Sequence, residues 1–217
     1  LCTLNLIDTP GHIDFSYEVE RSLACCEGAI LLVDATQGIQ AQTLAHFRLA
    51  QKLGLKIIPV INKIDLSNAQ SERVSKEYGV GFSLEKKEII FVSAKTGKNT
   101  DQALKAIVKQ IPPPKGNPNK PLRALVFDSF YHSHKGVVVY LKIVDGVLDF
   151  VKNKKQMLQF YASKIKFEPL GIGYLAPKMA KTNKLETGEI GYIATGLKDI
   201  NLCQVGDTVI KYKVQST

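Results

Sequence analysis

The sequence lacks the long apolar runs and the leader that membrane-spanning or secreted proteins carry. No apolar run approaches the roughly 20 residues that a helix needs to cross a bilayer, so we do not expect a membrane-spanning protein. The chain opens inside an apolar segment, Leu1–Leu4, and shows no signal peptide. A start of this kind predicts that the 217 residues are a fragment of a longer protein.

Cysteine is scarce, and its spacing does not suit a metal. The four cysteines are Cys2, Cys25, Cys26 and Cys203, and none of them forms a Cys-x-x-Cys pair. The adjacent Cys25 and Cys26 cannot provide the usual spacing of zinc ligands. We therefore predict buried, reduced thiols, which suit a reducing compartment.

Acidic residues are outnumbered, and the net charge is +9. Residues 121–217 hold 14 Lys and Arg against 8 Asp and Glu, whereas residues 1–120 hold 15 against 12. A basic second half is compatible with a phosphate-rich partner such as RNA. A basic surface that only keeps the protein soluble explains the charge equally well, so the charge does not decide between them.

Proline is concentrated in one place and divides the chain. Residues 111–121 hold five of the nine prolines. Proline fixes φ and removes a backbone donor, so this stretch can neither continue a helix nor enter a central strand. We predict a stiff, extended linker at residues 112–121, between an N-terminal domain at 1–111 and a C-terminal domain at 122–217.

Before the linker, short β-branched runs alternate with helical patterns. The expected strands are Leu4–Ile7, Ala29–Val33, Ile57–Ile61 and Ile89–Val92, and the expected helices are Phe15–Cys26, Ala41–Leu53 and Asp101–Ile111. Apolar runs of this kind are typical of strands that are buried on both faces of a parallel sheet. The alternation predicts a doubly wound α/β domain, in which ligands bind at the carboxyl ends of the strands.

After the linker the pattern is that of strands alone. The expected strands include Gly136–Ile143, Gly191–Ala194 and Asp207–Lys211, with turn signals at Asp145-Gly146 and at 205–207. No convincing amphipathic helix is present. We predict a small, closed antiparallel barrel.

The first of three polar motifs is Asp8-Thr-Pro-Gly-His12, directly after the first expected strand. An Asp at the carboxyl end of a strand can hold a metal ion through water, as in other phosphate-binding folds. Gly11 has no side chain, so its backbone N–H can approach a terminal phosphate closely. His12 would then stand where an attacking water must sit. The alternative is a simple turn into a helix, with Asp14 and Ser16 as possible caps.

The second motif, Asn62-Lys-Ile-Asp65, follows the third expected strand. The carboxylate of Asp65 can accept hydrogen bonds from guanine N1–H and the N2 amino group, a donor pair that adenine lacks. Asn62 can bond the base edge or tie neighbouring loops together, and the stem of Lys63 can cover the face of the ring. The alternative is a charged transition from strand to loop.

The third motif, Ser93-Ala-Lys95, follows the fourth expected strand. A backbone N–H near Ala94 would meet guanine O6, while Ser93 steadies the loop. The tripeptide says little alone, but three motifs in this order, each just after an expected strand, predict a guanine-nucleotide site.

The three motifs resemble signature motifs of the GTP-binding protein superfamily, and Asp8-Thr-Pro-Gly-His12 narrows the resemblance to translational GTPases. Further segments are similar to one branch, LepA, also called elongation factor 4, over most of residues 3–125. These segments are Phe15–Leu23, Glu27–Ala35, Gln42–Ala45, Asn62–Leu66, Ser93–Gly97 and Ile111–Pro114. The resemblance continues more thinly at 136–138, 188–191, 198–200 and 205–208, and residues 145–185 depart from the family pattern.

The resemblance implies a P-loop GTPase-type doubly wound sheet, truncated at its N-terminus, followed by an all-β translation-factor barrel. It implies GTP hydrolysis to GDP and phosphate on the ribosome, with GTP or GDP and Mg²⁺ as ligands. Asp8 would coordinate the magnesium ion through water, and His12 would position the attacking water once ribosomal RNA orders it. Gly11 would approach the phosphate, while Asn62, Lys63, Asp65, Ser93, Ala94 and Lys95 would bind the nucleotide.

One departure concerns the phosphate cradle. No Gly-x-x-x-x-Gly-Lys-[Ser/Thr] occurs in the 217 residues, and the switch-one threonine that the family places before the Asp8 motif is absent too. We therefore interpret the chain as a piece truncated at both ends, and we expect the isolated piece to be inactive as a GTPase.

Other interpretations stay open. The chain could be a binding module that docks on RNA or protein without nucleotide, or it could belong to another branch, of the elongation factor G or BipA type. The resemblance implies a cytoplasmic protein, or one of the mitochondrial or plastid matrix in a eukaryote. We expect the ribosome as partner and no stable homo-oligomer, and peripheral membrane association stays open.

Overall fold

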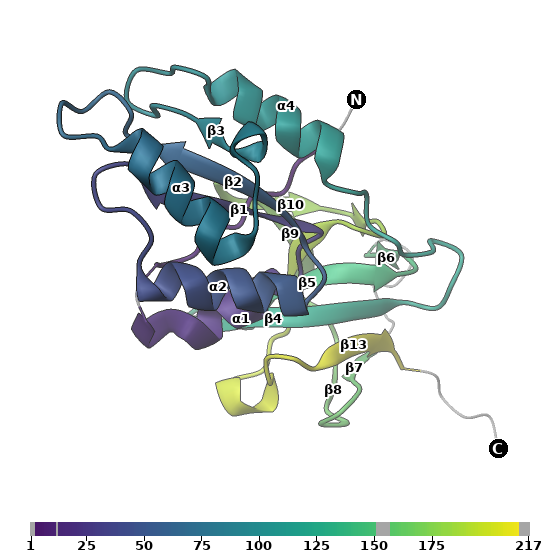
Figure 1. Cartoon of the computed structure of the whole chain (residues 1–217). Coiled ribbons are helices and arrows are strands. Elements are labelled where there is room, and N and C mark those ends of the chain that lie inside the picture. Colours follow the sequence, from purple (N-terminus) through teal and green to yellow (C-terminus); the bar gives the residue numbers. More distant parts are fainter. Residues whose placement is uncertain (1–2, 12, 151–156, 213–217) are drawn as a thin grey trace. The chain divides into compact units, whose positions relative to one another are not determined.

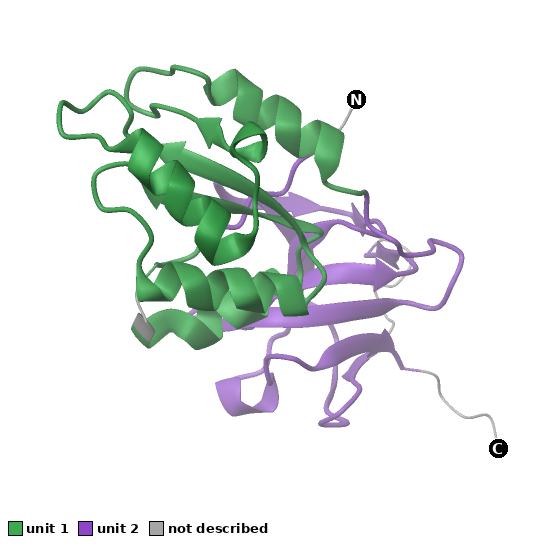
Figure 2. Ribbon diagram, in the orientation of Figure 1, with its two compact units in different colours: residues 1–3, 8–112 green, residues 4–7, 113–217 purple. Residues whose placement is uncertain are grey.

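The chain forms two compact units, shown in different colours in Figure 2. The computed structural model describes residues 3–11, 13–150 and 157–212. Unit 1 comprises residues 1–3 and 8–112, and unit 2 comprises residues 4–7 and 113–217. Each unit has hydrophobic clusters of its own.

Unit 1 is built on a parallel sheet of three strands in the order β1-β2-β3 (Figure 1). The strands are β1 (Gly28–Asp34), β2 (Lys56–Asn62) and β3 (Ile90–Phe91). The helices are α1 (Ser16–Leu23), α2 (Ala41–Lys52), α3 (Ser71–Phe82) and α4 (Thr100–Gln110), with short 3₁₀ turns η1 (Ile13–Phe15) and η2 (Lys86–Glu88). The predicted α/β alternation is thus confirmed for three of the four expected strands and all three expected helices, within a few residues at their ends.

Helices pack on both faces of the sheet at β2, whose side chains alternate between two hydrophobic clusters. Ile57 and Ile61 pack with the apolar faces of α2 and α3. Ile58 and Val60 point the other way and pack with α4. A sheet with helices on both faces is the doubly wound arrangement that the sequence predicts.

The expected strand Leu4–Ile7 is wrong. These residues have no regular structure, and the side chain of Leu6 is 85% exposed. A strand needs a neighbour for its backbone N–H and C=O groups. Among the described residues, β1 pairs only with β2, and residues 4–7 group with unit 2.

Helix α3 has no counterpart among the sequence-based predictions. It contains Gly79 and Gly81, which lower intrinsic helix propensity. Tertiary packing overrides this, because Val74, Tyr78 and Phe82 lie on one face and are buried. The buried hydroxyl of Tyr78 donates a hydrogen bond to the carbonyl oxygen of Leu31 in β1, at 2.8 Å.

Unit 2 is all-β, and its main sheet has eight antiparallel strands in the order β10-β9-β12-β5-β4-β13-β7-β8. Its strands are β4 (Arg123–His132), β5 (Gly136–Asp145), β6 (Leu148–Asp149), β7 (Leu158–Phe160), β8 (Lys166–Phe167), β9 (Gly171–Ala176), β10 (Lys178–Thr182), β11 (Lys184–Leu185), β12 (Ile190–Ala194) and β13 (Thr208–Lys211). Strands β6 and β11 form a separate pair, and η3 (Ile200–Leu202) is a 3₁₀ turn. The three strands expected after the linker are therefore confirmed.

The larger hydrophobic cluster of unit 2 lies inside its curved sheet. Inward side chains from β4 to β9 and from β11 to β13 all belong to this cluster, including Val139, Leu141, Phe160, Ile193 and Val209. Two register shifts bend β4 along its length. A sheet that curls around one core in this way has the form of a β-barrel, although in the described residues the pairing runs from β10 to β8 without closing the ring.

The proline-rich segment has no helix or strand, as predicted, but part of it is bound to the barrel. The carboxylate of Asp145 accepts a hydrogen bond from the Asn117 N–H at 2.9 Å, and the Gly146 N–H donates to the Asn117 carbonyl at 2.9 Å. A side chain on Gly116 would collide with the backbone of residue 144 and with Thr187. Residues 116–117 are therefore packed against unit 2.

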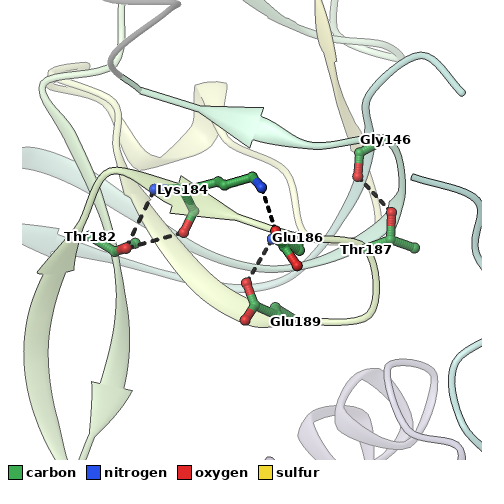
Figure 3. Close-up of polar contacts among 6 residues, drawn as sticks. All are labelled: Gly146, Thr182, Lys184, Glu186, Thr187 and Glu189. Atoms are coloured by element: carbon green, nitrogen blue, oxygen red, sulfur yellow. Dashed lines mark hydrogen bonds and ion pairs between the residues drawn. The ribbon is translucent and has the colours of Figure 1, made fainter. Parts of the chain in front are cut away.

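The barrel turn that receives this segment is itself held by polar contacts (Figure 3). The Thr187 hydroxyl donates to the carbonyl of Gly146 at 2.6 Å, and the Glu186 N–H donates to the Glu189 carboxylate at 2.7 Å. Lys184 forms an ion pair with Glu186 beside them. Gly188 has φ +90°, and a Cβ at this position would meet the ring of Pro114. The turn is thus shaped to accept a proline.

The structure also bears on the scarce cysteines and on membrane spans. Cys25 and Cys203 are buried and form no disulfide, whereas Cys26 is only half-buried, and Cys2 lies outside the described residues. Burial raises the pKa of the Cys203 thiol to about 11. None of the helices in the described part of the chain is long and apolar enough to cross a membrane.

Candidate functional site

The carboxyl ends of β1, β2 and β3 lie at the same edge of the parallel sheet, and a polar loop follows each of them. We call them the first loop (34–38), the second loop (62–66) and the third loop (93–98). Asp34 and Asn62 are register partners at the ends of β1 and β2. Six of the predicted site residues lie in the second and third loops.

Asn62 ties the three loops together. Its side-chain oxygen accepts hydrogen bonds from the Lys63 N–H at 2.8 Å and from the Ala94 N–H in the third loop at 3.0 Å. Its carbonyl accepts from the Ala35 N–H in the first loop at 2.9 Å. Of the two roles considered for Asn62, tying the loops is the one that this structure displays.

Asp65 is exposed, and a neighbour favours its charged form. A hydrogen bond from the Ser93 side chain lowers the pKa of the Asp65 carboxyl, opposed by desolvation and helped by the charge of Lys95. Ser93 is fully buried, and its hydroxyl oxygen also accepts from the Thr96 N–H at 3.1 Å. The second loop therefore presents to solvent a carboxylate whose charged form is favoured by a hydrogen bond from a buried residue of the third loop.

Lys63 is held at both its backbone and its side chain. Its φ is +66°, in the left-handed region that residues with a side chain rarely adopt. Its ammonium lies 2.6 Å from the Asp34 carboxylate. The other Asp34 oxygen accepts from the Thr36 N–H and hydroxyl, both at 2.7 Å. Partial burial raises the pKa of Asp34, but the hydrogen bonds from Lys63 and Thr36 prevail and bring it to about 2.

Asp34 is the site residue that sequence reasoning missed. It stands at the carboxyl end of a predicted strand and two residues before Thr36, a spacing at which an Asp side chain bonds the backbone ahead of it. That signal was available, but the partner, Lys63, follows a different strand.

Of the remaining predicted residues, Asp8, Gly11 and His12 belong to none of the three loops. Asp8 and Gly11 are exposed and belong to the irregular segment before η1. A Cβ on Gly11 would meet nothing within 4 Å, so there is open space beside its backbone. His12 lies outside the described residues. Lys95 is exposed in the third loop, and its charge helps to lower the pKa of Asp65.

Among the predicted site residues, Asp8 is the one assigned to magnesium. Asp8 is a single exposed carboxylate, whose oxygen chemistry suits a water-mediated contact to Mg²⁺. Within residues 3–11, 13–150 and 157–212, no three or more His, Cys, Asp or Glu side chains cluster so as to hold a metal ion. At the same sheet edge, the second and third loops present the Asp65 carboxylate and the Ala94 N–H.

Comparison with known proteins identifies the family. The family described as "Elongation factor Tu GTP binding domain" matches residues 2–113. The chain belongs to this family. It is 52% identical over 206 residues to "Elongation factor 4" of Dehalococcoides mccartyi, which covers 95% of this chain and 33% of that protein. It is 48% identical over 210 residues to "Translation factor GUF1 homolog, mitochondrial" of Arabidopsis thaliana, with 97% and 31% covered.

These relatives confirm the resemblance to elongation factor 4 that the motifs indicate. The chain spans about a third of the length of the curated relatives that it matches. Among solved structures, a bacterial selenocysteine-specific elongation factor, EF-Sec, superimposes with a TM-score of 0.71 at 24% identity. The superposition covers 94% of this chain and 35% of the EF-Sec chain. At 24% identity the similarity concerns the fold alone.

Proposed function

We propose that the protein is a ribosome-dependent GTPase of the elongation factor 4 type, which hydrolyses GTP to GDP and phosphate on elongating ribosomes. The observation that carries the proposal is the exposed Asp65 carboxylate in the second loop, after β2, whose ionised form is favoured by a hydrogen bond from Ser93 in the third loop, after β3. The family match and the names of the relatives support the same function.

The base would be recognised by the second and third loops. Asp65 accepts from guanine N1–H and the N2 amino group, so adenine would leave this carboxylate unpaired and be rejected. The stem of Lys63 covers one face of the ring. The Ala94 N–H donates a hydrogen bond to the Asn62 side chain. When the nucleotide binds, this N–H would donate to guanine O6, either as well or instead. Ser93 and Lys95 keep the third loop and the charge of Asp65 in place.

The reacting end of the nucleotide would meet the segment that begins at Asp8. We assign Asp8 to a water-mediated contact with Mg²⁺, an ion that neutralises charge developing on the phosphates in this reaction class. Gly11 leaves its backbone N–H free to approach the terminal phosphate, with open space beside it. We assign the positioning of the attacking water to His12.

The domains and partners follow from the same proposal. Residues 1–111 would be the GTP-binding domain, residues 112–121 the linker and residues 122–217 the barrel domain II. The ribosome is the proposed partner, and no stable homo-oligomer is expected. We propose a cytoplasmic location, or the matrix of a mitochondrion or plastid in a eukaryote, and the name of the Arabidopsis relative supports the mitochondrial alternative. Because the 217 residues hold no phosphate-cradle motif, we propose that this stretch alone binds GTP weakly and does not hydrolyse it.

The test is an exchange of base specificity at Asp65. In the full-length gene product, Asp65→Asn should weaken GTP and strengthen XTP, because the amide offers a donor to the O2 of xanthine. Competition binding with GTP, XTP and ATP measures this, and Asp101→Asn on the exposed α4 is a matched control. A variant that keeps the wild-type preference for GTP would remove Asp65 from this role. A protein that binds no nucleotide would support a docking module instead.

A further inference from the structure

The first loop contains a carboxylate with no role in the proposed hydrolysis, Asp34. Its side chain is only 17% exposed, and its two oxygens are divided between two partners. One oxygen receives both the N–H and the hydroxyl of Thr36, which fixes the carboxylate on the end of β1. The other oxygen is directed to the Lys63 ammonium, at 2.6 Å. Asp34 is therefore a fixed acceptor and not a freely rotating surface charge.

Lys63 is fixed at its other end by its backbone. The left-handed φ of +66° is stabilised by the hydrogen bond from its N–H to the Asn62 side chain. Lys63 is therefore held at both ends, at its backbone by Asn62 and at its ammonium by Asp34. The Lys63 side chain is nevertheless 52% exposed, so the stem offers an open apolar surface.

We propose that Asp34 is a positioning residue for nucleotide binding, which holds the Lys63 ammonium so that the stem is already laid out for one face of the purine. The inference rests on the proposed function and deepens it. A flexible lysine loses rotamer freedom when a base packs on it, and this loss lowers affinity. A stem that is ordered before the nucleotide arrives avoids part of that loss.

The same geometry predicts how the effect depends on the base. Asp65 reads N1–H and the N2 amino group, whereas the Lys63 stem contacts only the ring face. Loss of the Asp34 charge should therefore weaken guanine and hypoxanthine nucleotides by the same factor. A specificity role for Asp34 would instead change the ratio between them.

The decisive experiment is a double-mutant cycle in the full-length gene product, read out as the Kd of GDP and of IDP by calorimetry. Asp34→Asn keeps an oxygen for Thr36 and removes the charge that holds Lys63. Lys63→Met keeps an unbranched apolar stem without the ammonium. We expect Asp34→Asn to raise both Kd values by about threefold to tenfold, the scale of one charge-assisted contact at a partly exposed position. In the Lys63→Met background, Asp34→Asn should have no further effect.

Asp101→Asn is the matched control, because it removes an ion pair to Lys105 of similar length, 3.0 Å, on the exposed face of α4. It should leave both Kd values unchanged. If Asp34→Asn raises the Kd values by the same factor in the wild-type and the Lys63→Met backgrounds, the inference is overturned. Asp34 would then affect binding through the fold and not through Lys63. An Asp34→Asn protein that binds GDP as the wild type does would also overturn the inference. In either outcome, a preference for guanine that depends on Asp65 would leave the proposed function intact. A wild-type protein that binds no GDP would overturn both the inference about Asp34 and the proposed function.

Discussion

The tie that Asn62 makes between the loops can be tested by its removal. Asn62→Ala deletes the oxygen that accepts the Lys63 and Ala94 N–H groups at 2.8 and 3.0 Å. A hydrogen bond of this kind contributes about 0.5–1.5 kcal/mol net, so the two together contribute roughly 1–3 kcal/mol. Both lie at exposed positions where water can replace the lost acceptor, which favours the lower part of that range. At about 1–2 kcal/mol, GDP affinity should fall about 5-fold to 30-fold.

The assay is the Kd of GDP for the full-length gene product, measured together with its denaturant unfolding. Asn201→Ala is the control, because Asn201 also bonds a neighbouring side chain, Asp199, but in an exposed turn of the barrel. We expect the control to bind GDP as the wild type does. If Asn62→Ala binds GDP within twofold of the wild type, the loops are ordered by other contacts and the reasoning fails. The same conclusion follows if the loss of affinity is matched by global unfolding.

Two further predictions concern catalysis and the core of unit 1. His12→Ala should retain GTP binding but lose roughly 10²–10⁴-fold of ribosome-stimulated turnover, the usual scale for a positioned acid–base group, and stimulated turnover that survives would exclude His12. Burial raises the pKa of Tyr78 above its ordinary value of 10.0, so the folded state retains the hydroxyl proton after the unfolded chain has lost it. Ionisation of Tyr78 should therefore not change the free energy of unfolding below about pH 10. Above that pH the free energy of unfolding should fall as the pH rises, because the unfolded state then binds fewer protons than the folded state. Tyr78→Phe should flatten that alkaline decline in a pH series of denaturant unfolding, and an unchanged decline would show that other groups cause it.

The features that the sequence determined by itself are local ones. The sequence signal for β1, β2 and α2 lies within one short segment each. For the strands it is a β-branched run, and for the helix it is an apolar face followed by a terminating residue, so these elements were predictable. The positions of the second and third polar motifs were predictable for the same reason, since each lies at or just after the end of its strand, β2 or β3. The barrel was predictable as a class from turn signals such as Asp145-Gly146, where Gly146 indeed has φ +74°.

Tertiary structure decided everything that depends on which segments meet. The stretch Leu4–Ile7 has the composition of a strand, but a strand exists only where a neighbour accepts its hydrogen bonds. Helix α3 forms despite two glycines because the sheet buries Tyr78 and its hydroxyl finds a carbonyl in β1. The proline-rich segment is docked through Asn117 to Asp145, 28 residues away. Asp34 holds Lys63 only because parallel pairing of β1 and β2 brings their ends into register. No pattern within one segment can specify such a contact, since its partner is chosen by the packing of the whole sheet.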